Sequence, residues 1–384
     1  MNPQIDLNKV EISREALTNN IRTFRSLVGD KILCPCVKAN AYGHGLVECS
    51  RIFLEAGADW LSVNSLYEAV TLRDAGIDSP IYVLGYIPLD FLKKAVDLDL
   101  RMVVYNRETV EKLGGIGKKV RIHLKVETGN NRQGIDIDKL VDFAKFANGF
   151  ENIELEGLST HFANIEDTTN HDFAGKQLVR FIEACKILDI AGIKIPIRHC
   201  ANSAATILFP ETHFELVRVG IAAYGMWPSN ETYVSFVQKQ REDSSPLRDL
   251  SLKPAFKWTS KIVQLKDISE GEYIGYGCTY RTTRKTRVAV IGTGYYDGYD
   301  RGVSNKAHVV VNGKRAPVLG RVCMNLIMAD VSDVPAVSVE DDVVLIGTDG
   351  EETVSAELFA GWAGTINYEV TSRVNDRIPR IVVL

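Results

Sequence analysis

Lys38 lies in a setting that could support covalent chemistry. It follows an apolar run over residues 32–37 that is typical of a buried strand, and it precedes Gly43 and Gly45, which are typical of a turn. A lysine at the end of an apolar strand is partly desolvated, which favours the neutral amine that attacks carbonyl groups. The setting therefore predicts a carbonyl-binding lysine, although a surface lysine in a strand–helix turn would show the same local pattern.

A second set of residues could hold a phosphate group. Asn202 and Ser203 stand where a short helix should begin, and Gly220 and Ile221 follow the last predicted strand of the first half. Ser203 offers a hydroxyl, while Gly220 and Ile221 offer backbone N–H groups, and phosphates commonly bind to such donors. Asn202-Ser203 alone is equally typical of an ordinary helix cap.

Repeated strand–helix units must position these residues. Strands that are each followed by a helical pattern are predicted at residues 32–37, 60–63, 81–84, 102–104, 120–126, 153–160, 195–200 and 216–219. This alternation predicts an α/β fold with a parallel (β/α)8 barrel, which would place Lys38 and the phosphate-binding loops at the same rim. An open doubly wound sheet is the alternative that the pattern leaves open.

The pattern changes after the predicted barrel. Residues 229–253 are polar and have little apolar periodicity, so they predict a domain boundary. Short β-type runs then dominate, and Asn312-Gly313 between two of them predicts a two-residue hairpin. We therefore expect a barrel over residues 10–240 and a mainly β domain over residues 250–384, which residues 1–10 could join.

Composition excludes several classes of partner. The net charge of −4 does not favour nucleic acid or an anionic membrane, and no apolar run is long enough to span a bilayer. The N-terminus lacks the basic and then apolar pattern of a signal peptide. The seven cysteines are scattered and form no Cys-x-x-Cys pair, so neither a zinc site nor a thioredoxin-type motif is predicted. We expect a cytoplasmic protein without a metal.

The nine residues 37–45, VKANAYGHG, resemble the segment around the pyridoxal-phosphate lysine of the alanine racemase family. The resemblance spans both predicted domains. It implies that pyridoxal 5′-phosphate is held by Lys38, with Tyr42 at its phosphate and Arg218 at its pyridine nitrogen. Since a guanidinium does not release its proton, the ring nitrogen would stay largely unprotonated, which favours racemisation over transamination. The resemblance also places His161 and His199 at the same rim.

Racemisation needs two bases, because a proton leaves Cα on one face and another returns on the opposite face. The resemblance implies that Lys38, once the substrate has displaced it from the cofactor, is one base and that Tyr276 is the other. It further implies a head-to-tail homodimer, in which the β domain of one subunit covers the barrel mouth of the other and the active site is composite.

The same resemblance implies a set of substrate contacts. Arg132 would bind the carboxylate of a small amino acid, and Tyr295 and Met324 would line the substrate site. Lys125 matches a lysine that is often carbamylated in relatives, where its added negative charge would orient Arg132. The expected activity is the interconversion of L-alanine and D-alanine, which supplies D-alanine for peptidoglycan.

Three departures from the family pattern leave the substrate open. Asn131 lies in an altered arginine loop, Asn325 replaces a usual aspartate, and Asp376 stands where many members have a tyrosine. A smaller residue at 376 could admit a larger side chain, so a serine or broad-specificity racemase is an alternative. A non-catalytic barrel protein that binds pyridoxal phosphate and an amino-acid decarboxylase are alternatives from other classes.

Overall fold

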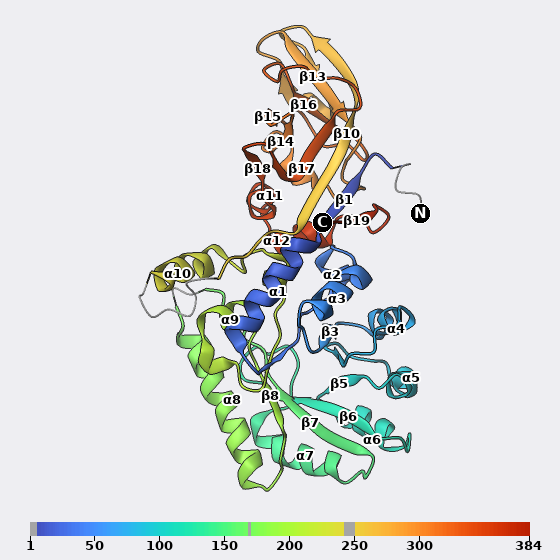
Figure 1. The fold of residues 1–384 in the computed structure, drawn as a ribbon, viewed down its shortest axis with the longest axis vertical. Coiled ribbons are helices and arrows are strands. Elements are labelled where there is room, and N and C mark those ends of the chain that lie inside the picture. The colour runs from blue at the N-terminus through green and yellow to red at the C-terminus, as the bar shows by residue number, and fades with distance from the viewer. Residues whose placement is uncertain (1–5, 168–169, 242–249) are drawn as a thin grey trace. The chain divides into compact units, whose positions relative to one another are not determined.

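The computed structural model describes residues 6–167, 170–241 and 250–384. The chain divides into two compact units. One unit consists of residues 16–41 and 46–253, and the other consists of residues 1–15, 42–45 and 254–384. Strands alternate with helices through the first unit, whereas strands dominate the second (Figure 1).

The first unit is a closed parallel barrel. Its strands are β2 (Ile32–Leu33), β3 (Leu61–Val63), β4 (Ile81–Val83), β5 (Arg101–Val104), β6 (Val120–Lys125), β7 (Ile153–Ser159), β8 (Ile197–His199) and β9 (Leu216–Val217). Strands β3 to β8 form one sheet in chain order, and β2 pairs with β9. A parallel bridge between Cys36 and Ser62 joins β2 to β3, and Glu215 N donates to Arg198 O at 3.2 Å between β9 and β8. The predicted (β/α)8 barrel is confirmed, and the open sheet is excluded.

Helices follow most of these strands. They are α1 (Arg14–Val28), α2 (Lys38–Tyr42), α3 (Leu46–Glu55), α4 (Leu66–Asp74), α5 (Leu92–Asp97), α6 (Arg107–Gly114), α7 (Leu140–Asn148), α8 (Asp172–Ile190), α9 (Ser203–Leu208) and α10 (Asn230–Gln240). Helix α4 begins with a capping box, in which Ser65 Oγ accepts from Glu68 N and the Glu68 carboxylate accepts from Ser65 N. Such local hydrogen bonds explain why the helix starts could be predicted from sequence.

Helix α10, which was not predicted, occupies the first half of the polar stretch over residues 229–253, and the two units divide at the end of this stretch, between residues 253 and 254. Ser229 caps this helix by accepting from Thr232 N at 3.0 Å. Phe236 is buried, and its ring centroid lies 4.7 Å from that of Trp227. Only Thr232 and Phe236 are buried on this helix, while Tyr233 and Val234 are exposed, so its apolar residues form no single buried stripe that periodicity could reveal. Residues 242–249 of the predicted boundary lie outside the described residues.

The second unit is built on a mixed sheet. Its strands are β1 (Lys9–Ser13), β10 (Phe256–Ile268), β11 (Tyr273–Ile274), β12 (Tyr280–Arg281), β13 (Thr286–Ile291), β14 (His308–Val311), β15 (Lys314–Pro317), β16 (Ile327–Asp330), β17 (Asp342–Asp349), β18 (Glu352–Val354) and β19 (Arg380–Val383). Its helices are α11 (Ala356–Ala363) and α12 (Asn367–Ser372). The main sheet runs β15-β14-β17-β10-β1-β19, and β13 also pairs with β10.

Two sequence predictions for this unit are confirmed. The N-terminal strand β1 joins the sheet, since it pairs with β10 and β19. Asn312-Gly313 closes the β14–β15 hairpin with φ of 48° and 69°, the left-handed values that a tight two-residue turn requires. The elements that were not predicted are strands β11, β12, β16, β18 and β19 and helix α12. Across residues 6–167, 170–241 and 250–384, no helix combines the length and apolar character needed to cross a membrane.

Candidate active site

Positive charge gathers at the carboxyl ends of the barrel strands. Lys125 ends β6, His199 ends β8, and Arg218 directly follows β9. Burial, together with the charges of Arg132 and Arg218, lowers the pKa of Lys125 to about 8. Burial and the charges of Arg218 and Arg132 likewise lower the pKa of His161 well below its ordinary value. The charge of Lys38 acts on both groups in the same direction. The rim is therefore a place where an anion would be stabilised.

The chain takes an unusual backbone path directly after Lys38. Ala39, Asn40, Ala41 and Tyr42 all have φ between 53° and 54°, in the left-handed region. Each non-glycine residue in that region is destabilised by about 1–2 kcal/mol. The predicted turn therefore starts before its glycines, and Lys38 precedes four strained residues. Backbone strain of this kind is concentrated at functional sites.

Two side chains hold this left-handed segment. The Ala39 N–H donates to Glu68 Oε1 at 2.6 Å, while the other oxygen of Glu68 closes the capping box of α4. The Leu46 N–H donates to Asn40 Oδ1 at 2.8 Å. Glu68 thus closes the helix cap with one oxygen and holds the segment after Lys38 with the other, and nothing in the local sequence pattern indicates the second contact.

Ser203 contacts the loop after β9, and the Gly220 N–H that was expected to face a phosphate donates to Ser203 instead. Ser203 Oγ accepts from Gly220 N at 2.9 Å and from Ala222 N at 3.4 Å. Ile221 begins a short 3-10 turn, so its N–H has no acceptor within that turn. Asn202 is a helix cap, since its Oδ1 accepts from Ala205 N at 3.0 Å, and its Nδ2 donates to Glu166. Asn202 therefore shapes the start of α9.

Arg218 is buried and tightly held. One of its nitrogens, Nη1, contacts Nδ1 of His199. The other, Nη2, donates to the carbonyl oxygens of Thr160 at 2.8 Å and Cys200 at 3.3 Å. With three acceptors, the guanidinium has one well-defined orientation at the end of the barrel.

The loop that carries Arg132 folds around a carboxylate. Burial raises the pKa of Glu127, but hydrogen bonds from the backbone N–H groups of residues 129–132 lower it. The net effect is a pKa below the ordinary value for glutamate. Lys125 Nζ donates to Gln133 Oε1 at 3.3 Å, and Gln133 Nε2 donates to Tyr105 Oη at 3.1 Å. Arg132 is exposed, so its guanidinium is accessible to an incoming anion. Asn131, one of the departures, adopts a left-handed φ of 53° in this loop.

Three predicted site residues of the strand-rich unit, Tyr276, Tyr295 and Met324, lie on neighbouring loops. Tyr295 N donates to Cys323 O and Tyr296 N donates to Met324 O, both at 2.9 Å, so the loops of Tyr295 and Met324 are paired. A Cβ on Gly320 would lie 2.5 Å from the oxygen of Ile274, which places the Tyr276 loop beside them. Tyr276, Tyr295 and Met324 are 71%, 44% and 56% exposed. These loops therefore present an apolar, partly phenolic surface.

The remaining predicted residues also belong to this unit. Tyr42 packs on Tyr368 with ring centroids 5.9 Å apart. Asp376 is exposed and lies 4.0 Å from Arg380, while Asn325 Nδ2 donates to Asp297 at 3.3 Å. Residues 42–45 group with this unit because Gly43 approaches Thr371, where a Cβ would lie 2.0 Å from the carbonyl oxygen.

Known proteins match this chain along almost its whole length. Residues 12–228 match the family model "Alanine racemase, N-terminal domain", and residues 255–382 match "Alanine racemase, C-terminal domain". The alanine racemase of Methanococcus maripaludis is 41% identical over 377 residues, which is 97% of each chain. That of Desulforamulus reducens is 40% identical over 380 residues, covering 97% of this chain and 98% of the other. The crystal structure of alanine racemase from Bacillus anthracis with bound L-Ala-P has a TM-score of 0.89 at 35% identity, covering 99% of this chain and 95% of that one.

Proposed function

This chain belongs to the alanine racemase family, and we propose that it is a pyridoxal-phosphate-dependent isomerase that interconverts L-alanine and D-alanine. The observation that carries the proposal is the gathering of Lys38, Lys125, Arg132 and Arg218 at one end of the barrel. A lysine for a carbonyl group, surrounded by cations for a phosphate and a carboxylate, suits a phosphorylated aldehyde cofactor and an amino-acid substrate. The bound L-Ala-P of the Bacillus anthracis enzyme agrees with a substrate of that size.

The residues present fit pyridoxal phosphate. Lys38 would hold its carbonyl carbon, Arg218 would face its ring nitrogen, and Ser203, Tyr42 and the N–H of Ile221 would contact its phosphate. When bound, the cofactor supplies an electron sink that makes the Cα–H of the substrate acidic. Because Arg218 donates and does not give up its proton, it stabilises a ring nitrogen that stays unprotonated.

Two bases move the substrate proton in this proposal. Lys38 exchanges a proton with Cα on one face, and the phenol of Tyr276 exchanges one on the other. The exposed loop surface of Tyr276, Tyr295 and Met324 supports a head-to-tail homodimer in which it covers the partner's barrel rim, because exposed apolar patches mark interaction sites.

Arg132 would bind the substrate carboxylate, and Lys125 would support Arg132. A pKa of about 8 leaves part of the Lys125 amine neutral near neutral pH, and a neutral amine can add carbon dioxide. That reaction forms a carbamate and releases one proton. The resulting negative charge would pair with Arg132 and orient its guanidinium toward the substrate.

A spectrum and a rate measurement test the proposal. The purified protein should show a near-visible absorbance band that borohydride removes and that Lys38→Ala lacks. The protein should racemise L-alanine, and a panel of other L-amino acids tests its specificity. A rate for serine exceeding that for alanine by tenfold would replace alanine as the substrate. Release of carbon dioxide would indicate a decarboxylase instead, and a band without turnover would indicate a non-catalytic cofactor-binding protein.

We expect the enzyme to supply D-alanine for peptidoglycan precursors in the cytoplasm. The seven cysteines are all free thiols, which suits a reducing compartment. Loss of the protein should then make growth depend on added D-alanine. Growth that does not depend on D-alanine would contradict this role while leaving the reaction in place.

A further inference from the structure

Arg218 begins a line of hydrogen bonds that connects four buried side chains of the barrel. Its Nη1 contacts Nδ1 of His199, and Nε2 of His199 lies 2.8 Å from Nδ1 of His123. Nε2 of His123 lies 3.0 Å from Oε2 of Glu156. The line thus starts after β9 and passes through β8 and β6 to β7. His123 and Glu156 have no part in the proposed proton transfers.

The two ends of this line determine which nitrogen carries each proton. A guanidinium can only donate, so Nδ1 of His199 must accept, and the proton of that ring must sit on Nε2. Nε2–H of His199 then donates to Nδ1 of His123, whose own proton must also sit on Nε2. That N–H donates to the Glu156 carboxylate, which can only accept. Both rings are therefore neutral, and donation runs in one direction from Arg218 to Glu156.

The surroundings of the two rings favour the neutral form. His123 and His199 are fully buried, and their centroids lie 4.7 Å and 5.3 Å from that of Tyr82. Burial and the charge of Arg218 lower the pKa of His199 well below its ordinary value. Burial also lowers the pKa of His123, although Glu156 opposes the shift. A proton added to either ring would set two donors face to face and break the line.

A register change in β7 places Glu156 beside His123. Ile122 pairs with Leu155, but His123 pairs with Gly157, so Glu156 is an extra residue between two successive pairs. A bulge of this kind redirects a side chain. A Cβ on Gly157 would lie 2.2 Å from Nδ1 of His123, so only glycine leaves room for this ring. The bulge and the glycine together build the contact between His123 and Glu156.

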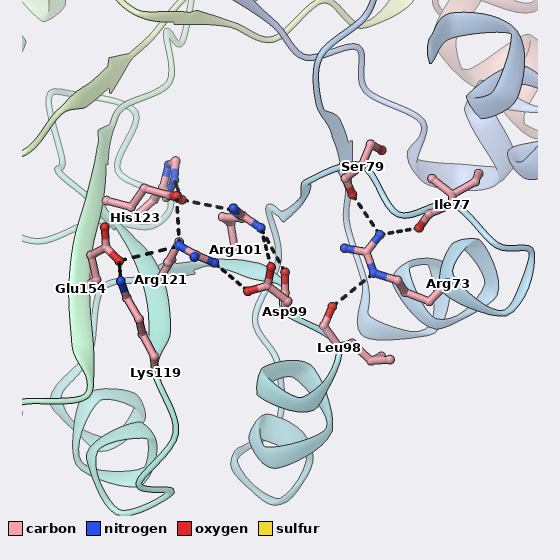
Figure 2. A network of polar contacts seen from close by, with 11 residues as sticks. Arg73, Ile77, Ser79, Leu98, Asp99, Arg101, Lys119, Arg121, His123 and Glu154 are labelled. Atoms are coloured by element: carbon pink, nitrogen blue, oxygen red, sulfur yellow. Dashed lines mark hydrogen bonds and ion pairs between the residues drawn. The ribbon is translucent and has the colours of Figure 1, made fainter. Parts of the chain in front are cut away.

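Two arginines neutralise the carboxylate end of the line. Nε of Arg101 lies 3.4 Å from Glu156 Oε2, and Nε of Arg121 lies 3.7 Å from Oε1. Figure 2 shows both arginines near His123 and shows that both contact Asp99. Asp99 is largely exposed, so the network extends from the buried rings to solvent. With this compensation, Glu156 can remain a carboxylate although it is buried.

We propose that His123 and Glu156 are positioning residues that hold Arg218 as an oriented, fully protonated guanidinium, an inference that rests on the proposed role of Arg218 at the cofactor ring. His199 Nδ1 accepts from Arg218 but is a poor base, because burial and the charge of Arg218 both oppose an imidazolium at this position. The guanidinium therefore keeps its proton. The line therefore secures an unprotonated ring nitrogen and, through it, suppresses transamination.

Nitrogen-15 NMR of histidine-labelled protein tests the line without any cofactor. The signals of His123 and His199, assigned by single substitutions in the cofactor-free protein, should each report a bare Nδ1 and a protonated Nε2. A protonated Nδ1 on either ring would overturn the proposal. If the cofactor-free protein shows these tautomers but the cofactor-loaded protein does not racemise alanine, the proposed function fails and the hydrogen-bond line stands.

Matched variants test the positioning role. Glu156→Leu removes the acceptor and should mix the tautomers of His123, whereas Glu156→Gln still presents an oxygen and should restore the wild-type signals. Glu154→Gln is the control, because Glu154 lies 3.7 Å from the same Arg121 Nε and binds Lys119 at 2.8 Å, but it is 41% exposed against 10% for Glu156. It therefore removes a carboxylate beside Arg121 without removing the Glu156 acceptor of His123. It should leave both rings unchanged.

The loaded enzyme gives a second readout. Glu156→Leu should lower kcat/KM roughly tenfold, the lower end of the range for losing a carboxylate that orients a metal-ligating histidine. It should also shift the cofactor absorbance and raise pyruvate release, with one pyruvate formed for each cofactor converted to its amine form. Glu156→Gln should recover most of the rate. If Glu156→Leu folds with wild-type absorbance, kcat/KM and pyruvate release, the positioning role is overturned. If Glu156→Leu does not fold, the positioning role is tested by the tautomers of the wild-type protein and by the kinetics of Glu156→Gln.

Discussion

Replacing Lys125 by methionine should make this protein more stable at neutral pH and less active. Lys125 is buried at the end of β6, where burial and the charges of Arg132 and Arg218 lower its pKa from an ordinary 10.5 to about 8. Below pH 8 the ammonium is present in both the folded and the unfolded chain, and the folded state carries the full penalty of holding it. A shift of this size corresponds to roughly 3 kcal/mol of stability. Methionine keeps a similar volume and removes the charge.

The pH dependence identifies the cause. Between pH 8 and 10.5 the unfolded chain binds a proton that the folded protein does not, so the stability of the wild type rises with pH across this window. Lys125→Met cannot titrate there. Its advantage should therefore be greatest at pH 7, where about 3 kcal/mol corresponds to roughly 6–12 °C in the unfolding midpoint, and should shrink by about pH 9.5.

Thermal unfolding of both proteins at several pH values is the assay, with carbon dioxide excluded. A variant that is no more stable than the wild type at pH 7, or an advantage that does not change with pH, would refute the assigned cause. Added bicarbonate provides a second arm, because a carbamate on Lys125 would replace the cation by an anion beside Arg132. Bicarbonate should then stabilise the wild type and leave Lys125→Met unaffected.

Three further predictions concern other parts of the molecule. Tyr276→Phe should lower kcat by roughly 10²–10⁴-fold, the range for loss of a general acid–base group, while the cofactor absorbance stays intact. An unchanged kcat would contradict the two-base proposal. Gly157→Ala should destabilise the barrel by about 1–3 kcal/mol, since the Cβ of the alanine would lie 2.2 Å from Nδ1 of His123. An unchanged unfolding midpoint would show that the His123 ring can move aside. Glu68→Ala should weaken cofactor binding in an absorbance titration, because it removes the acceptor of the Ala39 N–H beside Lys38. Glu48→Ala, at an exposed position of α3, should leave binding unchanged.

Local sequence signals predicted much of this fold, because the interactions that produce them span only a few residues. The capping box at Ser65 and Glu68, the Asn312-Gly313 turn and the alternation of barrel strands and helices depend on backbone geometry within one element. The predicted barrel and the strand-rich second unit followed from these signals. Helix α10 escaped prediction because its stability comes from a cap and one buried aromatic residue rather than from a full apolar stripe.

The sequence by itself determined the chemistry available to this protein, and the tertiary structure decided how that chemistry is held. Lys38 could be recognised from its strand, its turn and its resemblance to a known family. The left-handed residues 39–42 and the second contact of Glu68 could not, because strain is tolerated only where distant side chains hold it. In the same way, His123 and Glu156 look like ordinary strand residues until a bulge in β7 shifts the register. A bulge leaves no reliable mark on sequence periodicity, so only the folded barrel brings the carboxylate, the two imidazoles and Arg218 into one line.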